Sequence, residues 1–292
     1  MTGATTVAWC SIEWQRDGLG RPAFFCAEGN HEKLVTVGDN CIDVYPALGR
    51  GFSGGNAVNV AVSSVRYGMR PAYVGWVGED AYGDQLRREL MAQGVDVSHV
   101  HSRPGTTAQT FVALVGNERV LGEYAEGVMS EFFLSEEDLT WVGRFEMVHA
   151  GIWGRVEPYL SRLKAEDKII SFDFADKWDS PLWNELPPSL DYAFASAPAD
   201  TAELRDRMHE AVDLGAGTVI ITLGADGSLA YDGSRFYQQR AIPVTVVDTM
   251  GAGDAFIAGF LCAAAQGMDV AQAMEQGAVG AALTLGCQGA WS

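Results

Sequence analysis

The chain has 292 residues, of which 48 % are apolar, and its 38 acidic and 20 basic side chains give a formal net charge of −18. This length and apolar content suit one large α/β domain or two small ones and exclude a disordered chain. The negative charge argues against nucleic acid or an anionic membrane surface as partner, although backbone N–H groups and Mg²⁺ can still hold a nucleotide.

The first 32 residues differ from the rest of the chain. They show no sustained hydrophobic period, and the stretch GLGRP at 18–22 interrupts them. We therefore expect residues 1–32 to be a poorly ordered or loosely docked extension, and residues 33–292 to form the folded domain.

From Lys33 onward, short apolar runs alternate with segments of helical period. The runs predict buried strands at 34–38, 71–78, 147–154, 168–174, 190–197 and 218–224. The helical segments lie at 57–68, 82–94, 202–215, about 254–266 and 269–285, and SEED at 135–138 resembles a capping box that opens another. Residues 107–116 and 118–124 alternate like a hairpin around Gly116-Asn117. This order predicts a mostly parallel central sheet with helices on both faces and a small β excursion.

The five cysteines are scattered, odd in number and without C-x-x-C spacing. We therefore expect neither a structural zinc site nor a disulfide framework, and a reducing cytoplasm fits best. No apolar run is long enough to cross a bilayer, and no secretion signal opens the sequence. We expect a cytoplasmic protein without a membrane partner, in which Cys262 packs inside a helix.

The stretch DTMGAGDAF, at 248–256, places three small residues before an apolar helix. Such a turn exposes backbone N–H groups beside the positive end of the helix dipole, which is a place that attracts phosphate. A carboxylate there repels the same ligand unless Asp254 is needed to take a proton from an attacking hydroxyl. The alternative is an ordinary strand-to-helix turn in which Asp254 is only a cap.

Two earlier stretches place polar groups where ligands bind in an open α/β sheet, beyond the carboxyl ends of strands. GDNCID, at 38–43, offers Asp39 and Asp43 as acceptors for hydroxyls, unless they only form a turn. FSGGNAVN, at 52–59, follows paired glycines with Asn56 and Asn59 on one helical face. Two amides suit a polyhydroxy ligand, and an ordinary capped helix start explains them equally well.

A third stretch, TLGADG at 222–227, turns on two glycines directly after a buried strand. It can place a threonine and backbone N–H groups beside a nucleotide, or it can be a plain turn. The three stretches occur in an order that resembles the ribokinase-like (PfkB) family of carbohydrate kinases, from about Lys33 to the C-terminus. DTMGAGD and SGGNAVN are the signatures that carry the resemblance. GDNCIDVYP, FDFADKWDSPLW and FASAP are similar to the branch of that family that phosphorylates glycated lysine.

The resemblance implies a ribokinase-like fold and a role for each matching residue. It makes Asp254 the catalytic base, and it assigns the other positions to an anion hole (Gly251, Ala252, Gly253), a sugar site (Asp43, Gly54, Gly55, Asn59), a nucleotide site (Thr222, Gly224, Gly227) and a monovalent cation (Asp248).

Two departures from the family pattern bear on these expectations. The Asn-x-x-Glu pair that organises Mg²⁺ through water is absent, and the matching stretch offers only Ala197 and Asp200, which makes Asp200 the candidate. Only VYPALGRGF separates Asp43 from Ser53, where the family has a strand pair. We therefore expect a small lid built from about 44–53 and 107–128. The chain could form a homo-oligomer, but so small a lid gives no reason to expect the dimer that family members build through lid strands.

For several further residues, the sequence allows either a structural role or a contact with the substrate. His149 ends a predicted strand and is either a packed core histidine or a contact to sugar or lysine. Acidic and aromatic side chains that could cradle an ammonium group, or merely pack, are Asp173, Asp176, Trp178, Asp179, Trp183, Glu123 and Glu126.

The resemblance implies an ATP- and Mg²⁺-dependent kinase, with K⁺ as an optional ion, that phosphorylates the C6 hydroxyl of a fructosamine such as fructoselysine. Within the same fold, the substrate could instead be a free sugar such as fructose or 2-keto-3-deoxygluconate. From another class, the chain could be a non-catalytic sugar- or nucleotide-sensing protein. The intact Asp254 speaks against a sensor, because a sensor has no need of a base.

Overall fold

The computed structural model describes residues 33–115, 118–287 and 289–291. The predicted extension 1–32 and the hairpin turn at 116–117 lie outside these described residues. None of the helices in the described ranges has both the length and the hydropathy needed to cross a bilayer.

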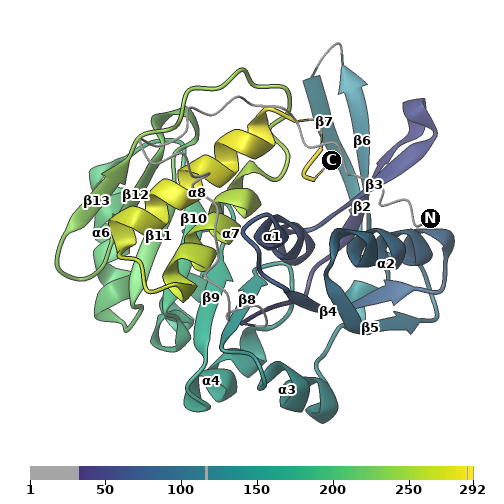
Figure 1. Cartoon of the computed structure of the whole chain (residues 1–292), viewed down its shortest axis with the longest axis horizontal. Coiled ribbons are helices and arrows are strands. Elements are labelled where there is room, and N and C mark those ends of the chain that lie inside the picture. The colour runs from purple at the N-terminus through teal and green to yellow at the C-terminus, as the bar shows by residue number, and fades with distance from the viewer. Residues whose placement is uncertain (1–32, 116–117, 288, 292) are drawn as a thin grey trace, which may run out of the picture.

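A nine-stranded sheet forms the centre of the molecule (Figure 1), in the order β13-β12-β11-β10-β9-β8-β1-β4-β5. It is parallel from β5 to β11, and β12 and β13 continue it antiparallel. The strands are β1 Leu34–Val37, β4 Ala72–Gly78, β5 Asp96–Arg103, β8 Met147–Gly151, β9 Ile169–Asp173, β10 Tyr192–Ser196, β11 Thr218–Thr222, β12 Ser228–Tyr231 and β13 Phe236–Gln239. The predicted α/β class is confirmed. The sequence analysis did not predict β5, β12 and β13.

Helices cover both faces of this sheet because successive strand residues point to opposite sides. Leu34 packs with α1 Asn56–Val65, α7 Ala252–Ala265 and α8 Val270–Leu285, while the next residue, Val35, packs into the cluster on the other face. That second cluster contains buried residues of α3 Glu136–Val142, α4 Glu157–Ala165, α5 Leu182–Glu185 and α6 Ala202–Asp213. The remaining helix, α2 Ala81–Gln93, packs beside α1.

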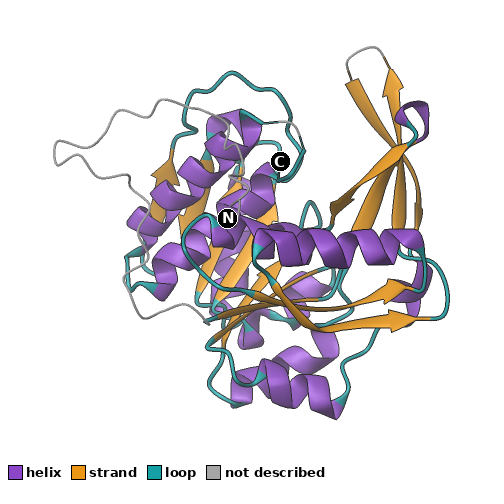
Figure 2. Ribbon diagram, turned by 45° about the vertical axis from the view of Figure 1, so that its right-hand side comes forward, coloured by secondary structure: helices purple, strands orange, loops and turns teal. Residues whose placement is uncertain are grey.

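A separate four-stranded sheet, in the order β3-β2-β6-β7, projects from the main body as the lid (Figure 2). Its strands are β2 Cys41–Tyr45, β3 Arg50–Gly54, β6 Gln109–Val115 and β7 Glu118–Ala125. The structure differs here from the sequence-based expectation, because the short stretch after Asp43 does form a strand pair. A three-residue 3₁₀ turn, Pro46–Leu48, suffices to reverse the chain, and Tyr45 packs edge-on against Phe52 at 5.3 Å.

Candidate active site

Asp254 lies in the first turn of α7, and two asparagines of α1 hold its carboxylate. Asn56 Nδ2 donates to Asp254 Oδ1 at 2.7 Å, and Asn59 Nδ2 donates to Oδ2, also at 2.7 Å. Residues three apart on a helix share a face, so α1 presents both amides to the same carboxylate. Both oxygens of Asp254 are therefore oriented by neutral donors.

Burial of the carboxyl group raises the pKa of Asp254 to about 6. The hydrogen bonds from Asn59 and Asn56 act in the opposite direction, and the nearby charge of Asp39 adds to the increase. At neutral pH the carboxylate is therefore ionised, yet basic enough to accept a proton. This is the pKa range in which a general base is most effective.

A second carboxylate, Asp173, lies beside the first at the end of β9. Its Oδ2 accepts from Asn56 Nδ2 at 2.8 Å, and its Oδ1 accepts from the N–H of Ala175 at 2.9 Å. Burial, and next to it the charge of Asp254, raise the pKa of Asp173 to about 8. Asp173 is thus part of the network around Asp254, a position that neither of its sequence-based interpretations foresaw.

His149 fixes the orientation of Asn56. Its ring is fully buried, and this burial lowers its pKa to about 3, so the imidazole is neutral. Nε2 lies 3.0 Å from Asn56 Oδ1, and Nδ1 lies 2.9 Å from Ser171 Oγ. Because Asn56 Oδ1 can only accept, Nε2 carries the hydrogen and Nδ1 accepts from the serine hydroxyl. The structure therefore places His149 as a positioning residue in the core.

The C-terminal segment completes the shell around the site. Trp291 Nε1 donates to Asn59 Oδ1 at 2.7 Å, which leaves the amide nitrogen of Asn59 facing Asp254. The carboxylate of Asp248 accepts from the N–H of Gly289 at 2.7 Å and from that of Met250 at 3.1 Å. Asp248 thereby ties the turn before α7 to this segment, and its role toward a monovalent cation stays a prediction.

The turn that opens α7 uses its two glycines differently. Gly251 has φ of 72°, and a Cβ there would come within 2.6 Å of Ala290 Cβ, so a larger residue would be both strained and obstructed. Gly253 has open space where its Cβ would lie. It lines the cavity described next, so a side chain there would occupy the volume of a ligand.

A cavity of about 670 Å³ brings the predicted nucleotide residues next to this turn. Thr222, Gly224 and Gly227 line it together with Ala252 and Gly253. Its apolar walls include Ile242, Pro243, Val244, Val246, Phe256 and Leu285. Apolar walls with a few polar groups at one end suit a nucleotide, whose base needs a dry surface and whose phosphates need N–H donors.

The four residues predicted for the sugar site gather on the lid side of Asp254. Asp43 is buried on β2, and a Cβ on Gly54 would lie 3.4 Å from Asp43 Oδ2 and 4.0 Å from Asn59 Oδ1. Gly54 therefore lies between these two polar groups. Gly55 precedes α1 with φ of 108°, and its Cβ would meet Asn40 Cα at 2.6 Å, so it permits a close backbone approach.

Asp39 has a role that the sequence analysis did not identify. Its Oδ2 accepts from the N–H of Asn56 at 2.7 Å, which caps the start of α1 where Gly55 offers no side chain. Burial raises the pKa of Asp39, and the hydrogen bond from Asn56 opposes this rise. The cap fixes the end of α1 that carries Asn56 and Asn59.

The two positions that match the family's magnesium-organising pair, Ala197 and Asp200, do not offer suitable ligands for Mg²⁺. Asp200 is exposed and forms a bidentate ion pair with Arg205, with both N···O distances at 2.7 Å. Ala197 has no side-chain oxygen that could bind a metal ion or its water. The charge of Asp200 is thus already balanced by an arginine, and this position does not fit a magnesium ligand.

Three of the other acidic and aromatic candidates have partners within the protein. Trp183 is fully buried and donates to the carbonyl of Arg207 at 3.0 Å, as packing predicts. Asp176 pairs with Lys177 at 2.9 Å. Glu126, at the base of the lid, pairs with Arg155 at 2.8 Å.

The profile described as pfkB family carbohydrate kinase matches residues 35–187 and 188–292, which is nearly all of the described chain. The chain belongs to the pfkB family of carbohydrate kinases. The family predicted from the sequence motifs is thus confirmed for this pfkB kinase.

Relatives within the family cover most of its length. The kinase is 56 % identical over 258 residues to proteins named fructoselysine 6-kinase from Shigella flexneri and Escherichia coli, covering 88 % of this chain and 99 % of theirs. It is 32 % identical to a fructosamine kinase of Bacillus subtilis, covering 89 % and 93 %. The structure of Arabidopsis thaliana ribokinase complexed with ribose and ATP superposes with a TM-score of 0.80 at 25 % identity, covering 89 % and 94 %.

Proposed function

We propose that this pfkB kinase transfers the γ-phosphoryl group of ATP to the C6 hydroxyl of fructoselysine. The 56 % identity to two fructoselysine 6-kinases supports the substrate, and the likeness to a ribokinase complexed with ATP supports the nucleotide. The observation that carries the proposal is the position of Asp254. Its carboxylate is held by Asn56 and Asn59 at the start of α7, and the two preceding residues line the cavity that suits a nucleotide.

The chemistry follows from this arrangement. The C6 hydroxyl gives its proton to Asp254, the hydroxyl oxygen bonds to the γ-phosphorus, and the bond from that phosphorus to the bridging oxygen of ADP breaks. The first-turn N–H groups of α7 have no partner within the helix and can offset the charge on the transferring group. Of these, the N–H of Ala252 makes only a long 3.4 Å bond to the carbonyl of Thr249. Mg²⁺ would arrive with the phosphates of ATP, which supply the oxygen ligands it prefers.

The lysine part of fructoselysine ends in an ammonium and a carboxylate, and we propose that Glu126 and Arg155 recognise this pair. Both side chains are about half exposed, so their mutual ion pair contributes little and can open at a cost of ~1 kcal/mol or less. They lie on the sugar side of the site, because Glu126 comes directly after β7, where Tyr124 pairs with Thr110 of β6, and Thr110 in turn pairs with Asp43 of β2. A planar guanidinium binds a carboxylate through two hydrogen bonds.

The proposal also includes a cytoplasmic location. The five cysteines of the sequence are scattered and show no C-x-x-C spacing, which fits a reducing compartment.

The experiment that tests the proposal compares kcat/KM for fructoselysine and for fructose, ribose and 2-keto-3-deoxygluconate under one set of conditions. We expect fructoselysine to exceed fructose by at least ~10-fold, which needs only about 1.4 kcal/mol of differential binding. Equal efficiency, or a preference for a free sugar, would overturn the substrate while leaving the kinase. Failure to transfer phosphate to any of these sugars would favour the sensing alternative.

A further inference from the structure

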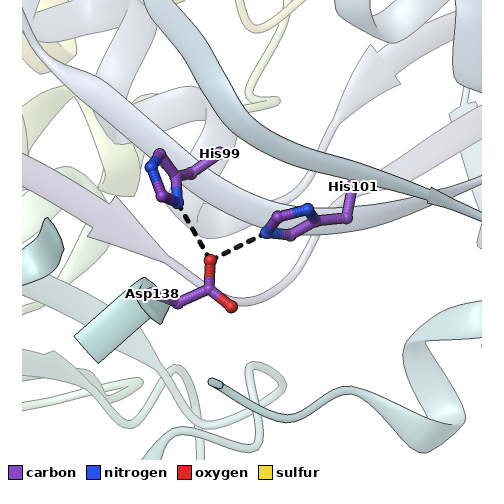
Figure 3. Close-up of side chains that lie close together, drawn as sticks. All are labelled: His99, His101 and Asp138. Atoms are coloured by element: carbon purple, nitrogen blue, oxygen red, sulfur yellow. Dashed lines mark hydrogen bonds and ion pairs between the residues drawn. The ribbon is translucent and has the colours of Figure 1, made fainter. Parts of the chain in front are cut away.

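Three potential metal ligands meet at the outer edge of the central sheet (Figure 3), in a part of the molecule that the proposed reaction does not use. His99 and His101 lie two residues apart on the edge strand β5 and point to the same side, where they face Asp138 of α3. His99 Nδ1 lies 3.0 Å and His101 Nε2 lies 2.7 Å from the same atom, Asp138 Oδ1.

The other oxygen of Asp138 is already bonded. Oδ2 accepts from the Ser135 hydroxyl at 2.6 Å and from the Ser135 N–H at 3.1 Å, as part of the capping box that opens α3. This leaves Oδ1 directed at the two imidazoles. Asp138 is only 3 % exposed, so its position is fixed by packing as well as by hydrogen bonds. The carboxylate is thus held in place before any ion arrives.

We propose that His99 Nδ1, His101 Nε2 and Asp138 Oδ1 bind a divalent transition-metal ion, with Zn²⁺ as the ion that fits best. Two imidazole nitrogens and one carboxylate oxygen are a ligand set that zinc accepts, with a fourth position for water. The three ligand atoms lie within 4.8 Å of one another. Tetrahedral zinc with bonds of roughly 2.0–2.2 Å holds its ligand atoms about 3.4 Å apart, so small side-chain rotations complete the site.

The surroundings allow an ion and a water molecule to enter. The side chain of His101 is 34 % exposed, so the cluster borders solvent on the His101 side. A surface cavity of about 580 Å³ reaches His99, and its other walls include Glu137, whose negative charge favours a cation, and Arg144, whose positive charge opposes one. The ring of Trp141 stacks on His99 with centroids 4.1 Å apart and limits its rotation. Such supporting contacts hold a ligand in its binding orientation.

The role that this position implies is structural. β5 is the last strand of the sheet, and α3 precedes β8 in the chain, so an ion shared by them joins two distant segments. Because metal binding favours the folded state, it should raise the stability of this edge. The alternative is that these side chains only form two hydrogen bonds to the carboxylate of Asp138. A zinc site predicts measurable binding of Zn²⁺, and a plain hydrogen-bond cluster does not.

The test uses the full chain after treatment with a chelator. Isothermal titration with Zn²⁺ should show one site whose affinity falls by roughly tenfold or more in His99→Gln and in His101→Gln. Zn²⁺ should also raise the melting temperature of the wild-type chain but not of these variants. His209→Gln is the matched control, since His209 is an exposed histidine packed on Tyr231, outside the triad. It should bind zinc like the wild type.

Circular dichroism checks that the variants are folded, and zinc K-edge absorption of the loaded wild-type chain gives a readout that needs no variant. That spectrum should show nitrogen and oxygen ligands with two imidazoles. Equal zinc affinity in the wild type and in His101→Gln, a shell dominated by cysteine sulfur, or no zinc uptake by the wild type would each overturn the proposal.

Discussion

Asp173 and Asp254 share one donor atom, Nδ2 of Asn56, which lies 2.8 Å from the first carboxylate and 2.7 Å from the second. Two partly buried carboxylates this close do not both ionise readily, because each charge disfavours the other. The pKa of Asp173 is raised to about 8 and that of Asp254 to about 6, so near pH 7 Asp173 holds a proton and Asp254 carries the charge. This division leaves a single base beside the place where phosphate must bind.

Replacing Asp254 by asparagine keeps the size of the side chain but removes the base. We expect kcat to fall by roughly 10²- to 10⁴-fold, with little change in sugar affinity, because proton removal contributes only in the transition state. Steady-state kinetics gives kcat, and titration calorimetry gives the affinity for fructoselysine. Near-normal turnover would mean that the base lies elsewhere.

The raised pKa of Asp254 predicts how the reaction depends on pH. Below about pH 6 the carboxylate takes up a proton, so kcat/KM should fall about tenfold per pH unit in the acid range. A pH–rate profile between pH 4.5 and 8 measures this fall, with the free energy of unfolding checked at each end. A profile that stays flat down to pH 5 would contradict the role of Asp254.

Asp173 predicts a dependence of stability on pH. Its pKa rises from 3.8 to about 8 on folding, so its contribution to stability is present at low pH and is lost as pH rises from about 4 through 8. Asp173→Asn does not titrate and escapes this loss. Urea unfolding should therefore show the variant gaining stability relative to the wild type between pH 5 and pH 8. Parallel pH profiles for the two proteins would show that Asp173 is ionised throughout.

The two glycines of the α7 turn should respond differently to alanine. Gly251→Ala places a Cβ against Ala290 in a backbone conformation with positive φ. We expect the free energy of unfolding to fall by roughly 1–3 kcal/mol, and the activity to fall as well. Gly253→Ala meets open space and should fold normally, but its methyl group enters the nucleotide cavity and should raise KM for ATP. Thermal unfolding and ATP kinetics separate the two effects. Equal melting temperatures would contradict the strain at Gly251.

Arg155→Ala tests the recognition of the lysine part. We expect KM for fructoselysine to rise by roughly tenfold while the constants for fructose stay unchanged, because fructose lacks the carboxylate. Arg162→Ala is the matched control, since Arg162 of α4 is similarly exposed and pairs with Glu136 of α3 at 2.7 Å. If both variants, or neither, change KM for fructoselysine, Arg155 does not contact the substrate.

The alternation of apolar runs and helical periods predicted the α/β class, because periodicity reports directly which face of an element is buried. It missed β5, whose polar sequence DVSHVHSR contains a single buried residue, Val100. It also missed β12 and β13, which are only four residues each. The Asp232-Gly233 pair between these two strands is a hairpin signal that could have revealed them.

The residues proposed for the reaction came from local signatures, whereas the contacts among them did not. Asn56 was expected to face a sugar, but in the structure its amide joins Asp173 to Asp254 while its oxygen faces His149. These partners depend on how α1, β9 and α7 lie in space, which no local pattern specifies. Trp291, which orients Asn59, carries no sequence signal of its own.

The span of these contacts has a consequence for how the chain acquires activity. Asn56 is 117 positions from Asp173 and 198 positions from Asp254, so the network closes only after α1, β9 and α7 have come together through chain-distant contacts. Local helices form in microseconds, whereas contacts of high sequence separation form late. After dilution from denaturant, the far-ultraviolet helical signal should therefore recover first and phosphate transfer last. Turnover would then report the completion of folding in this kinase.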